Sequence, residues 1–185
     1  MLFRSFHAAV DSPVLLTLAR PLLRRTLARL SAVVPVSEAA AATVAAVRRG
    51  TDVTIIPNPI DVTGFRRAVL AKPGPGREAG SVLFLGRGDE PRKGLDDLLS
   101  AWPLIRAARP HAELVIAGRM TRTDFPEGTT VLGEVSAADK PGVYAGADVY
   151  VAPNRGGESM GMVLVEAMAC GTAVVATDLP AFTAV

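Results

Sequence analysis

The chain has 185 residues, 49% of them hydrophobic and 21% charged, with a formal net charge of +2 at pH 7. That size and composition suit one good-sized core or parts of two smaller ones. A single cysteine, Cys170, excludes an intrachain disulfide and fits a reducing compartment. No apolar run approaches the roughly 20 residues needed to span a bilayer, and the opening MLFRSFHAAV is a poor match to a signal peptide. A cytoplasmic location is therefore predicted.

The small net charge conceals an asymmetry along the chain. Residues 1–50 carry a formal net charge of +5, whereas the remainder of the chain carries a net charge of −3. The simplest interpretation of the basic part is a solvated helix face, but a stretch such as LARPLLRRTLARL also suits a position near anionic lipid or a phosphate ligand. Nucleic acid is not a predicted partner, because aromatic residues make up only 5% and no nucleic-acid-binding module is recognisable.

The first part of the chain predicts helices and short strands. A basic helix is expected over 14–30, interrupted or restarted at Pro21, followed by a strand over 31–37. Ser37 is a suitable N-cap for the next helix, and 52–58 has the composition of another strand. The stretch 66–80, which contains KPGPGREAG, has the composition of a linker, and a domain boundary is predicted there.

After the linker, apolar runs alternate regularly with helical patterns. Helices are expected over 93–109, over 136–147 with Pro141 in an unfavourable position, and over 159–170. Continuous Val, Ile and Leu strands of this kind indicate a parallel sheet covered on both faces, which binds ligands at the carboxyl ends of its strands. The fold class is α/β. The expected strands are 81–86, 112–118, 129–135, 148–153 and 172–177.

Both ends of the chain interrupt this pattern. The sequence stops at TDLPAFTAV, directly after an expected buried strand and without a closing helix. No first strand is recognisable ahead of the elements in 1–65. The chain is therefore expected to be a piece of a larger protein.

The loop GRGDEPRKG (86–94) joins the first strand after the linker to the following helix. It begins like a dinucleotide-binding loop, but Pro91 stands at the third glycine position and no acidic residue follows at the required distance. Arg87, Arg92 and Lys93 cluster there, and they could belong to a solvated loop or to an anion site. Their location at the ligand-binding edge of the sheet favours an anion, most simply phosphate.

The stretch GGESMGMVLVEAMACG (156–171) carries two carboxylates, Glu158 and Glu166. The glycine pair allows a close backbone approach to a ligand, and the helix after it presents free N–H groups to a phosphate. Glu158 could cap this helix or hold a sugar. Glu166 lies among apolar residues with no basic residue one turn away, so it needs another partner, and the hydroxyl pair of a sugar suits a carboxylate. These residues together indicate a nucleotide diphosphate sugar.

These motifs resemble a known family. GGESMGMVLVEAMACG resembles the block of two glutamates found in retaining glycosyltransferases of the GT-B class, family four, also called glycosyl transferases group 1. LFLGRGDEPRKG, the FHAAV near the start and IIPNPIDVTGF resemble the phosphatidylinositol mannosyltransferases of actinobacteria within that family. The resemblance implies two Rossmann-like domains: a remnant of the N-terminal, acceptor-side domain in 1–65, a linker in 66–80, and the nucleotide-sugar-binding domain in 81–185.

The resemblance also implies roles for individual residues. Arg87 and Lys93 would bind the donor diphosphate, Glu158 the donor sugar and Glu166 the ribose hydroxyls. Lys140 would lie near the base. His7 of the first domain would lie beside the reacting sugar and, with Glu158, Arg87 and Lys93, form the catalytic group. Backbone amides would approach the phosphate and the sugar from Ser159, Met160, Gly161 and Met162.

The resulting prediction is retaining transfer of a sugar, mannose from GDP-mannose, to a lipid or glycan acceptor such as phosphatidylinositol. Neither a metal nor a cofactor is expected, since there is no D-x-D pair and no His/Cys cluster with metal-ligand spacing. The enzyme would be cytoplasmic and peripheral at the inner face of the plasma membrane. The alternatives are a non-catalytic nucleotide-sugar-binding fragment and a GT-B epimerase, and this chain alone is expected to be inactive.

Overall fold

The computed structural model describes residues 3–6, 13–30, 32–47, 53–71 and 80–185, and their contacts divide the chain into two compact units. The first unit comprises Met1–Pro59, Gly156–Gly161 and Leu179–Val185. The second comprises Ile60–Arg155 and Met162–Asp178. His7 lies outside the described residues.

The second unit is built on a five-stranded sheet in which every neighbouring pair is parallel, in the order β5-β4-β3-β6-β7. The predicted α/β class with a parallel sheet is therefore confirmed. Chain order reverses at β3, because β4 lies on one side of it and β6 on the other, and the carboxyl ends of β3 and β6 form a topological switch point. The strands are β3 (Ser81–Leu85), β4 (Glu113–Ala117), β5 (Thr129–Gly133), β6 (Val149–Ala152) and β7 (Ala173–Ala176).

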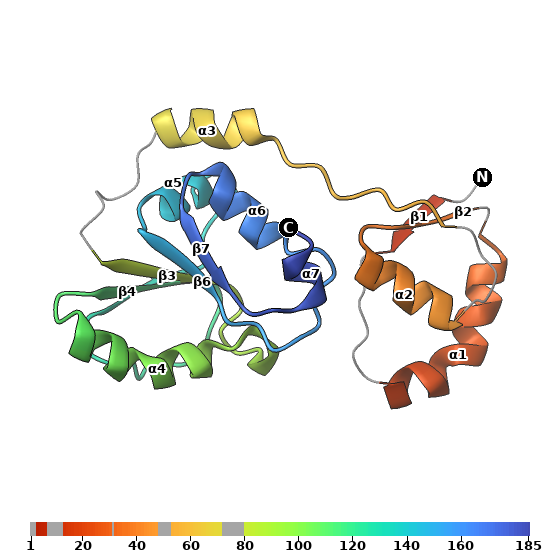
Figure 1. Ribbon diagram of the computed structural model, residues 1–185, viewed down its shortest axis with the longest axis horizontal. Coiled ribbons are helices and arrows are strands. Elements are labelled where there is room, and N and C mark those ends of the chain that lie inside the picture. The colour runs from red at the N-terminus through yellow and green to blue at the C-terminus, as the bar shows by residue number, and fades with distance from the viewer. Residues whose placement is uncertain (1–2, 7–12, 31, 48–52, 72–79) are drawn as a thin grey trace. The chain divides into compact units, whose positions relative to one another are not determined.

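Helices lie on both faces of this sheet, with α4 on one side and α5 and α6 on the other (Figure 1). The α4 side holds an apolar core in which Trp102 and Leu98 pack against Phe84, Leu114 and Ile116. The Trp102 indole also donates a hydrogen bond to the Glu127 carbonyl at 3.2 Å, so its one polar group is satisfied. The helices are α4 (Leu95–Ala108), α5 (Lys140–Ala145) and α6 (Met162–Ala169), with a 3₁₀ turn, η1, at Pro91–Lys93.

Three expectations about the part of the chain after the linker are wrong. Pro141 is compatible with its helix, because α5 begins at Lys140 and places the proline in the first turn, where its missing N–H costs nothing. The last strand, β7, is an edge strand and largely exposed, with Val175 at 56%. A short helix, α7 (Pro180–Thr183), follows β7 in the chain, although no closing helix was expected.

The linker expected over 66–80 begins later than predicted. Helix α3 (Val62–Ala71) occupies its first six positions and contacts α5 and α6, so the second unit already starts at Ile60. Asp61 caps this helix, because its carboxylate accepts a hydrogen bond from the Gly64 N–H at 2.8 Å. Residues 72–79 lie outside the described part of the chain.

The first unit contains a parallel pair of strands, β1 (Phe3–Phe6) and β2 (Ala32–Pro35), with helices α1 (Pro13–Ala28) and α2 (Glu38–Val47). The presence of β1 contradicts the expectation that no first strand precedes the other elements. Helix α1 continues through Pro21. The predicted cap at Ser37 is confirmed, since its hydroxyl accepts the Ala40 N–H at 3.1 Å. The core contains Leu27, Val33, Val44 and Val47.

The strand expected over 52–58 is absent from the described residues, which begin again at 53 in this region. Ile56 donates one backbone hydrogen bond to the Pro35 carbonyl at 3.0 Å. Pro57 and Pro59 follow directly, and since proline has no N–H, the chain cannot continue a ladder there.

Candidate donor site

The basic loop after β3 is organised around a carboxylate that the sequence analysis did not single out. This carboxylate belongs to Glu90, which forms an ion pair with each arginine. Its Oε1 lies 2.7 Å from the Arg87 guanidinium, and its Oε2 lies 2.8 Å from the Arg92 guanidinium. The two guanidinium groups therefore share one counter-ion, and together with Lys93 the four side chains keep a charge of +2. Arg87 and Glu90 are three positions apart in a turn that the Glu90 N–H closes on the Arg87 carbonyl at 3.1 Å, and this turn spacing was the signal that could have revealed the pairing.

Hydrogen bonds from the end of β4 hold the loop in place. The Asp89 carboxylate accepts the Thr121 N–H at 2.8 Å and the Thr121 hydroxyl at 2.9 Å. The Gly88 N–H donates to the Arg119 carbonyl at 3.0 Å. Gly118 approaches so closely that an added Cβ would lie 1.9 Å from the Gly86 carbonyl oxygen. The basic side chains thus extend from a backbone that is fixed on both sides.

The same loop is also fastened to the end of β6, across the switch point. Gly94, which separates η1 from α4, has φ of +72°, and a Cβ there would lie 1.9 Å from the Pro153 carbonyl oxygen. The Arg155 N–H donates to the Arg92 carbonyl at 2.8 Å. The Arg155 guanidinium forms a two-pronged ion pair with Asp97 at 2.6 and 2.7 Å, which lowers the pKa of that carboxyl.

Glu166 on α6 finds its partners on α5. Its Oε2 accepts a hydrogen bond from the Tyr144 hydroxyl at 3.0 Å and lies 3.5 Å from the Lys140 Nζ. Lys140 and Tyr144 are four residues apart on one helix, so they present their side chains to the same neighbour. No basic residue lies one turn away along α6, as expected, but the cation comes from a different helix. No local motif indicated this pairing.

Burial sets the protonation state around Glu166. Burial first, and then neighbouring Tyr150 and Glu166, raise the pKa of Tyr144 far above its usual value, so the phenol remains a hydrogen-bond donor. Burial, followed by the Glu166 charge, raises the pKa of the Cys170 thiol to about 11. Cys170 is therefore a protonated packing residue at neutral pH.

The remaining predicted residues of the described chain are divided between the two units. Glu158, Ser159, Met160 and Gly161 group with it, whereas Met162 opens α6 in the second. Glu158 precedes the first residue of α6 by four positions, so it does not occupy the N-cap position of that helix. The two predicted carboxylates thus fall in different units.

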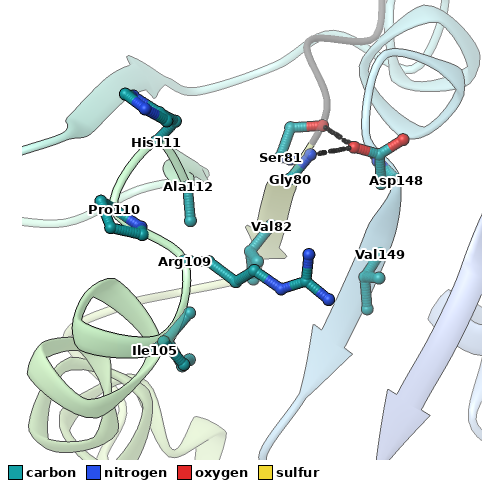
Figure 2. A pocket seen from close by; sticks show the side chains of 11 residues that line it. Gly80, Ser81, Val82, Ile105, Arg109, Pro110, His111, Ala112, Asp148 and Val149 are labelled. Atoms are coloured by element: carbon teal, nitrogen blue, oxygen red, sulfur yellow. Dashed lines mark hydrogen bonds between the residues drawn. The ribbon is translucent and has the colours of Figure 1, made fainter.

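A separate cavity of about 750 Å³ lies at the amino-terminal edge of the sheet, where β3 and β6 begin and α4 ends (Figure 2). Its walls are mainly apolar, with the Arg109 side chain extending between Val82 and Val149. The Asp148 carboxylate ties the strand starts together by accepting the Gly80 N–H at 2.7 Å and the Ser81 N–H at 3.0 Å. None of the predicted donor-binding residues lines this cavity.

Two features are absent from the described residues: a cluster of metal ligands and a membrane-spanning helix. No group of three or more His, Cys, Asp or Glu side chains there could hold a metal ion, so the metal-free site remains a prediction. Among the helices in the described ranges, none combines the length and apolar character that crossing a membrane requires.

Comparison with known proteins identifies the family to which the chain belongs. A family model described as "Glycosyl transferases group 1" matches residues 79–185, and the chain belongs to this family. It is 49% identical over 140 residues to a phosphatidyl-myo-inositol mannosyltransferase of Mycolicibacterium smegmatis, covering 72% of this chain and 36% of that protein. It is 40% identical over 191 residues to a protein of the same name from Mycobacterium tuberculosis, covering 96% of this chain and 48% of that protein. The chain thus spans about half the length of these relatives.

Solved structures confirm the fold. Anabaena HepE in complex with UDP and glucose superposes with a TM-score of 0.68 at 22% identity, covering 94% of this chain and 50% of that one. At this level of identity the likeness concerns the fold alone. It agrees with the GT-B fold class that the sequence resemblance implied.

Proposed function

We propose that this protein transfers a mannosyl residue from GDP-mannose to phosphatidylinositol with retention of anomeric configuration. The proposal rests on one observation: the unit built on the parallel sheet contains two features that suit a sugar nucleotide. A fixed basic loop lies at the switch point, and Glu166, a carboxylate held on one oxygen, lies on α6 after β6. The family membership and the names of the relatives agree with glycosyl transfer.

The diphosphate is assigned to the basic loop. Arg87 and Lys93 contact phosphate oxygens, while Glu90 keeps the guanidinium groups oriented before the ligand arrives. In transfer, the bond between the anomeric carbon and the diphosphate oxygen breaks, and negative charge develops on the leaving group. Fixed cations stabilise that charge without a metal ion. The acceptor hydroxyl attacks from the leaving-group face, and a phosphate oxygen takes its proton.

The sugars are assigned to the carboxylates. Glu166 accepts hydrogen bonds from the ribose hydroxyls through Oε1, because both of its described contacts fall on Oε2. Glu158 holds the donor sugar, and the amides of Ser159 to Met162 bind phosphate and sugar. Lys140, proposed from the resemblance to lie near the base, is also the counter-ion of Glu166.

The lipid acceptor is assigned partly from α1. This helix exposes Leu18 at 76% and Leu22 at 71%, and the same part of the chain carries Arg20, Arg24, Arg25 and Arg29. Apolar and basic side chains on one helix suit the interface of an anionic membrane. We therefore include peripheral binding at the inner membrane face in the proposal.

The test is a transfer assay with radiolabelled GDP-mannose and vesicles that contain phosphatidylinositol. It compares this chain with a version extended to the full length of the relatives, with UDP-glucose as the control donor. Radiolabelled mannosyl lipid from the extended protein, and little from this chain, is expected, because catalysis requires donor and acceptor held together. Binding of GDP without transfer by either protein would favour the alternative, a non-catalytic nucleotide-sugar-binding protein. Transfer from UDP-glucose instead would overturn the assigned donor.

A further inference from the structure

The Tyr144 hydroxyl is committed to a single acceptor, Glu166 Oε2, at 3.0 Å. Within the described ranges, the other oxygen of that carboxylate, Oε1, accepts no hydrogen bond. We infer that Tyr144 is a positioning residue: it fixes the Glu166 carboxylate so that Oε1 is presented to the ribose hydroxyls of a nucleotide. This inference rests on the proposed function, because it assumes that Glu166 binds the ribose.

Tyr144 is better suited to this role than Lys140, the other partner of Glu166. Tyr144 is fully buried, whereas the Lys140 side chain is 31% exposed and its Nζ lies farther away, at 3.5 Å. A lysine is a mobile point charge, while a phenol hydroxyl donates in one direction that its ring determines. Lys140 thus supplies charge, and Tyr144 supplies orientation.

The surroundings of Tyr144 keep its ring in place. Its ring packs edge-on against Tyr150 with centroids 5.3 Å apart. Its backbone carbonyl accepts the Thr172 hydroxyl at 2.6 Å, a bond that is itself buried. A phenylalanine could make the same ring contacts, so packing alone does not require the hydroxyl. The Tyr144 hydroxyl is required because the Glu166 carboxylate is only 16% exposed and needs a hydrogen-bond donor.

The experiment measures the affinities of GDP and of 2′,3′-dideoxy-GDP for the full chain by calorimetry. Three proteins are compared: wild type, Tyr144→Phe and, as the matched control, Tyr150→Phe. Tyr150 is the other buried tyrosine of the pair, and its hydroxyl donates to the Leu85 carbonyl at 3.4 Å instead of to Glu166. Hydrogen bonds to a carboxylate predict that wild type prefers GDP by about 10–100-fold. Tyr144→Phe should reduce that preference to about threefold or less, while Tyr150→Phe should retain it.

The outcomes separate this inference from the proposed function. An unchanged preference in Tyr144→Phe, with wild type still discriminating, would overturn the role of Tyr144 and leave the ribose role of Glu166 intact. Equal affinity of wild type for the two nucleotides would overturn the ribose role itself. Pyrophosphate, which has no ribose, should bind all three proteins equally. A loss of pyrophosphate binding in Tyr144→Phe alone would assign the hydroxyl to folding and would also overturn the inference.

Discussion

The two edges of the parallel sheet in the second unit are held together in different ways. At the carboxyl edge, the ends of β3, β4 and β6 are linked by hydrogen bonds, glycine contacts and ion pairs around the loop 86–94. At the amino edge, one carboxylate, Asp148, joins β3 to β6 beside an apolar cavity. The carboxyl edge is therefore a fixed frame for charged side chains, and the amino edge is a simpler structural junction.

The difference indicates that the proposed ligand-binding edge requires an ordered backbone. A cation that must meet a diphosphate gains most when its backbone is already ordered, because the ordering entropy is then lost on folding and not on binding. Gly94 and Gly118 provide this order through backbone contacts that no side chain could allow. If this comparison holds, changes at the carboxyl edge should affect both folding and nucleotide binding, and changes at the amino edge should affect folding alone.

Gly94→Ala should have the largest effect. Its added Cβ would lie 1.9 Å from the Pro153 carbonyl oxygen, and its φ of +72° is unfavourable for alanine. Backbone strain and the clash together should destabilise the protein by about 2–4 kcal/mol. Urea unfolding measures this loss. Gly171→Ala is the matched control, since Gly171 has a φ of +76° but no atom within 4 Å of the added Cβ, and should cost about 1 kcal/mol. Equal losses would mean that the contact with Pro153 contributes nothing.

Asp148→Ala should come next, and it tests the amino edge. Its carboxylate accepts hydrogen bonds from the Gly80 N–H, the Ser81 N–H and the Ser81 hydroxyl. Loss of these bonds should destabilise the protein by about 1–3 kcal/mol. Nucleotide affinity of the folded protein should not change. A large loss of GDP affinity at full folding would contradict the separation of the two edges.

Much of this unit could be predicted from the sequence because its strands are continuous apolar runs. Such runs bury both faces in a parallel sheet, and the strands at 81–86 and 112–118 are confirmed within a residue or two. The prediction of a strand over 52–58 was wrong for its described residues, because the apolar run ends at prolines that cannot continue a ladder. Helix α3 was overlooked, although Asp61 before Val62 was an available capping signal.

The candidate site was predictable only in part. The basic cluster and the two glutamates are visible as local motifs, and the proposed binding of phosphate and sugar was inferred from them. The pairing of Glu166 with Lys140 and Tyr144 joins residues more than 20 positions apart, through the packing of α5 on α6. Periodicity reports which face of a helix is apolar, but not which helix lies opposite. Polar partners of buried groups are therefore the part of a site that one sequence reveals least.

Arg87→Ala and Lys93→Ala should each weaken GDP binding by about 1–3 kcal/mol, as expected for hydrogen bonds to charged groups. Guanosine, which has no phosphate, should bind as before. Arg109→Ala is the matched control, because Arg109 is an exposed arginine of the same unit that lies at the amino edge (Figure 2). Calorimetry with GDP and with guanosine distinguishes a lost diphosphate contact from a folding defect. Equal losses for GDP and guanosine would indicate a folding defect instead of a diphosphate contact.

The smallest effect should come from the ion pair of Asp97 with Arg155, which connects the start of α4 to the segment after β6. Both side chains are about half exposed, so water and salt weaken the pair. The hydrogen bond from Arg155 lowers the pKa of Asp97 in the folded protein relative to the unfolded chain. The stabilising contribution is therefore fully present above the ordinary pKa of an aspartate, about 4, and disappears as the pH falls through the lowered value.

Asp97→Asn tests this direction of the pH dependence directly. The substitution should lower the urea midpoint slightly at pH 7, and the difference from wild type should shrink as the pH approaches the lowered pKa and as salt is added. Asp124→Asn provides the control, since Asp124 is 91% exposed and lies 3.5 Å from Arg122 at its nearest. If the Asp97 variant differed from wild type equally at neutral and acidic pH, the carboxylate charge would not be what fastens α4 to the end of β6. The carboxyl edge would then depend on its backbone contacts, with Gly94 first among them.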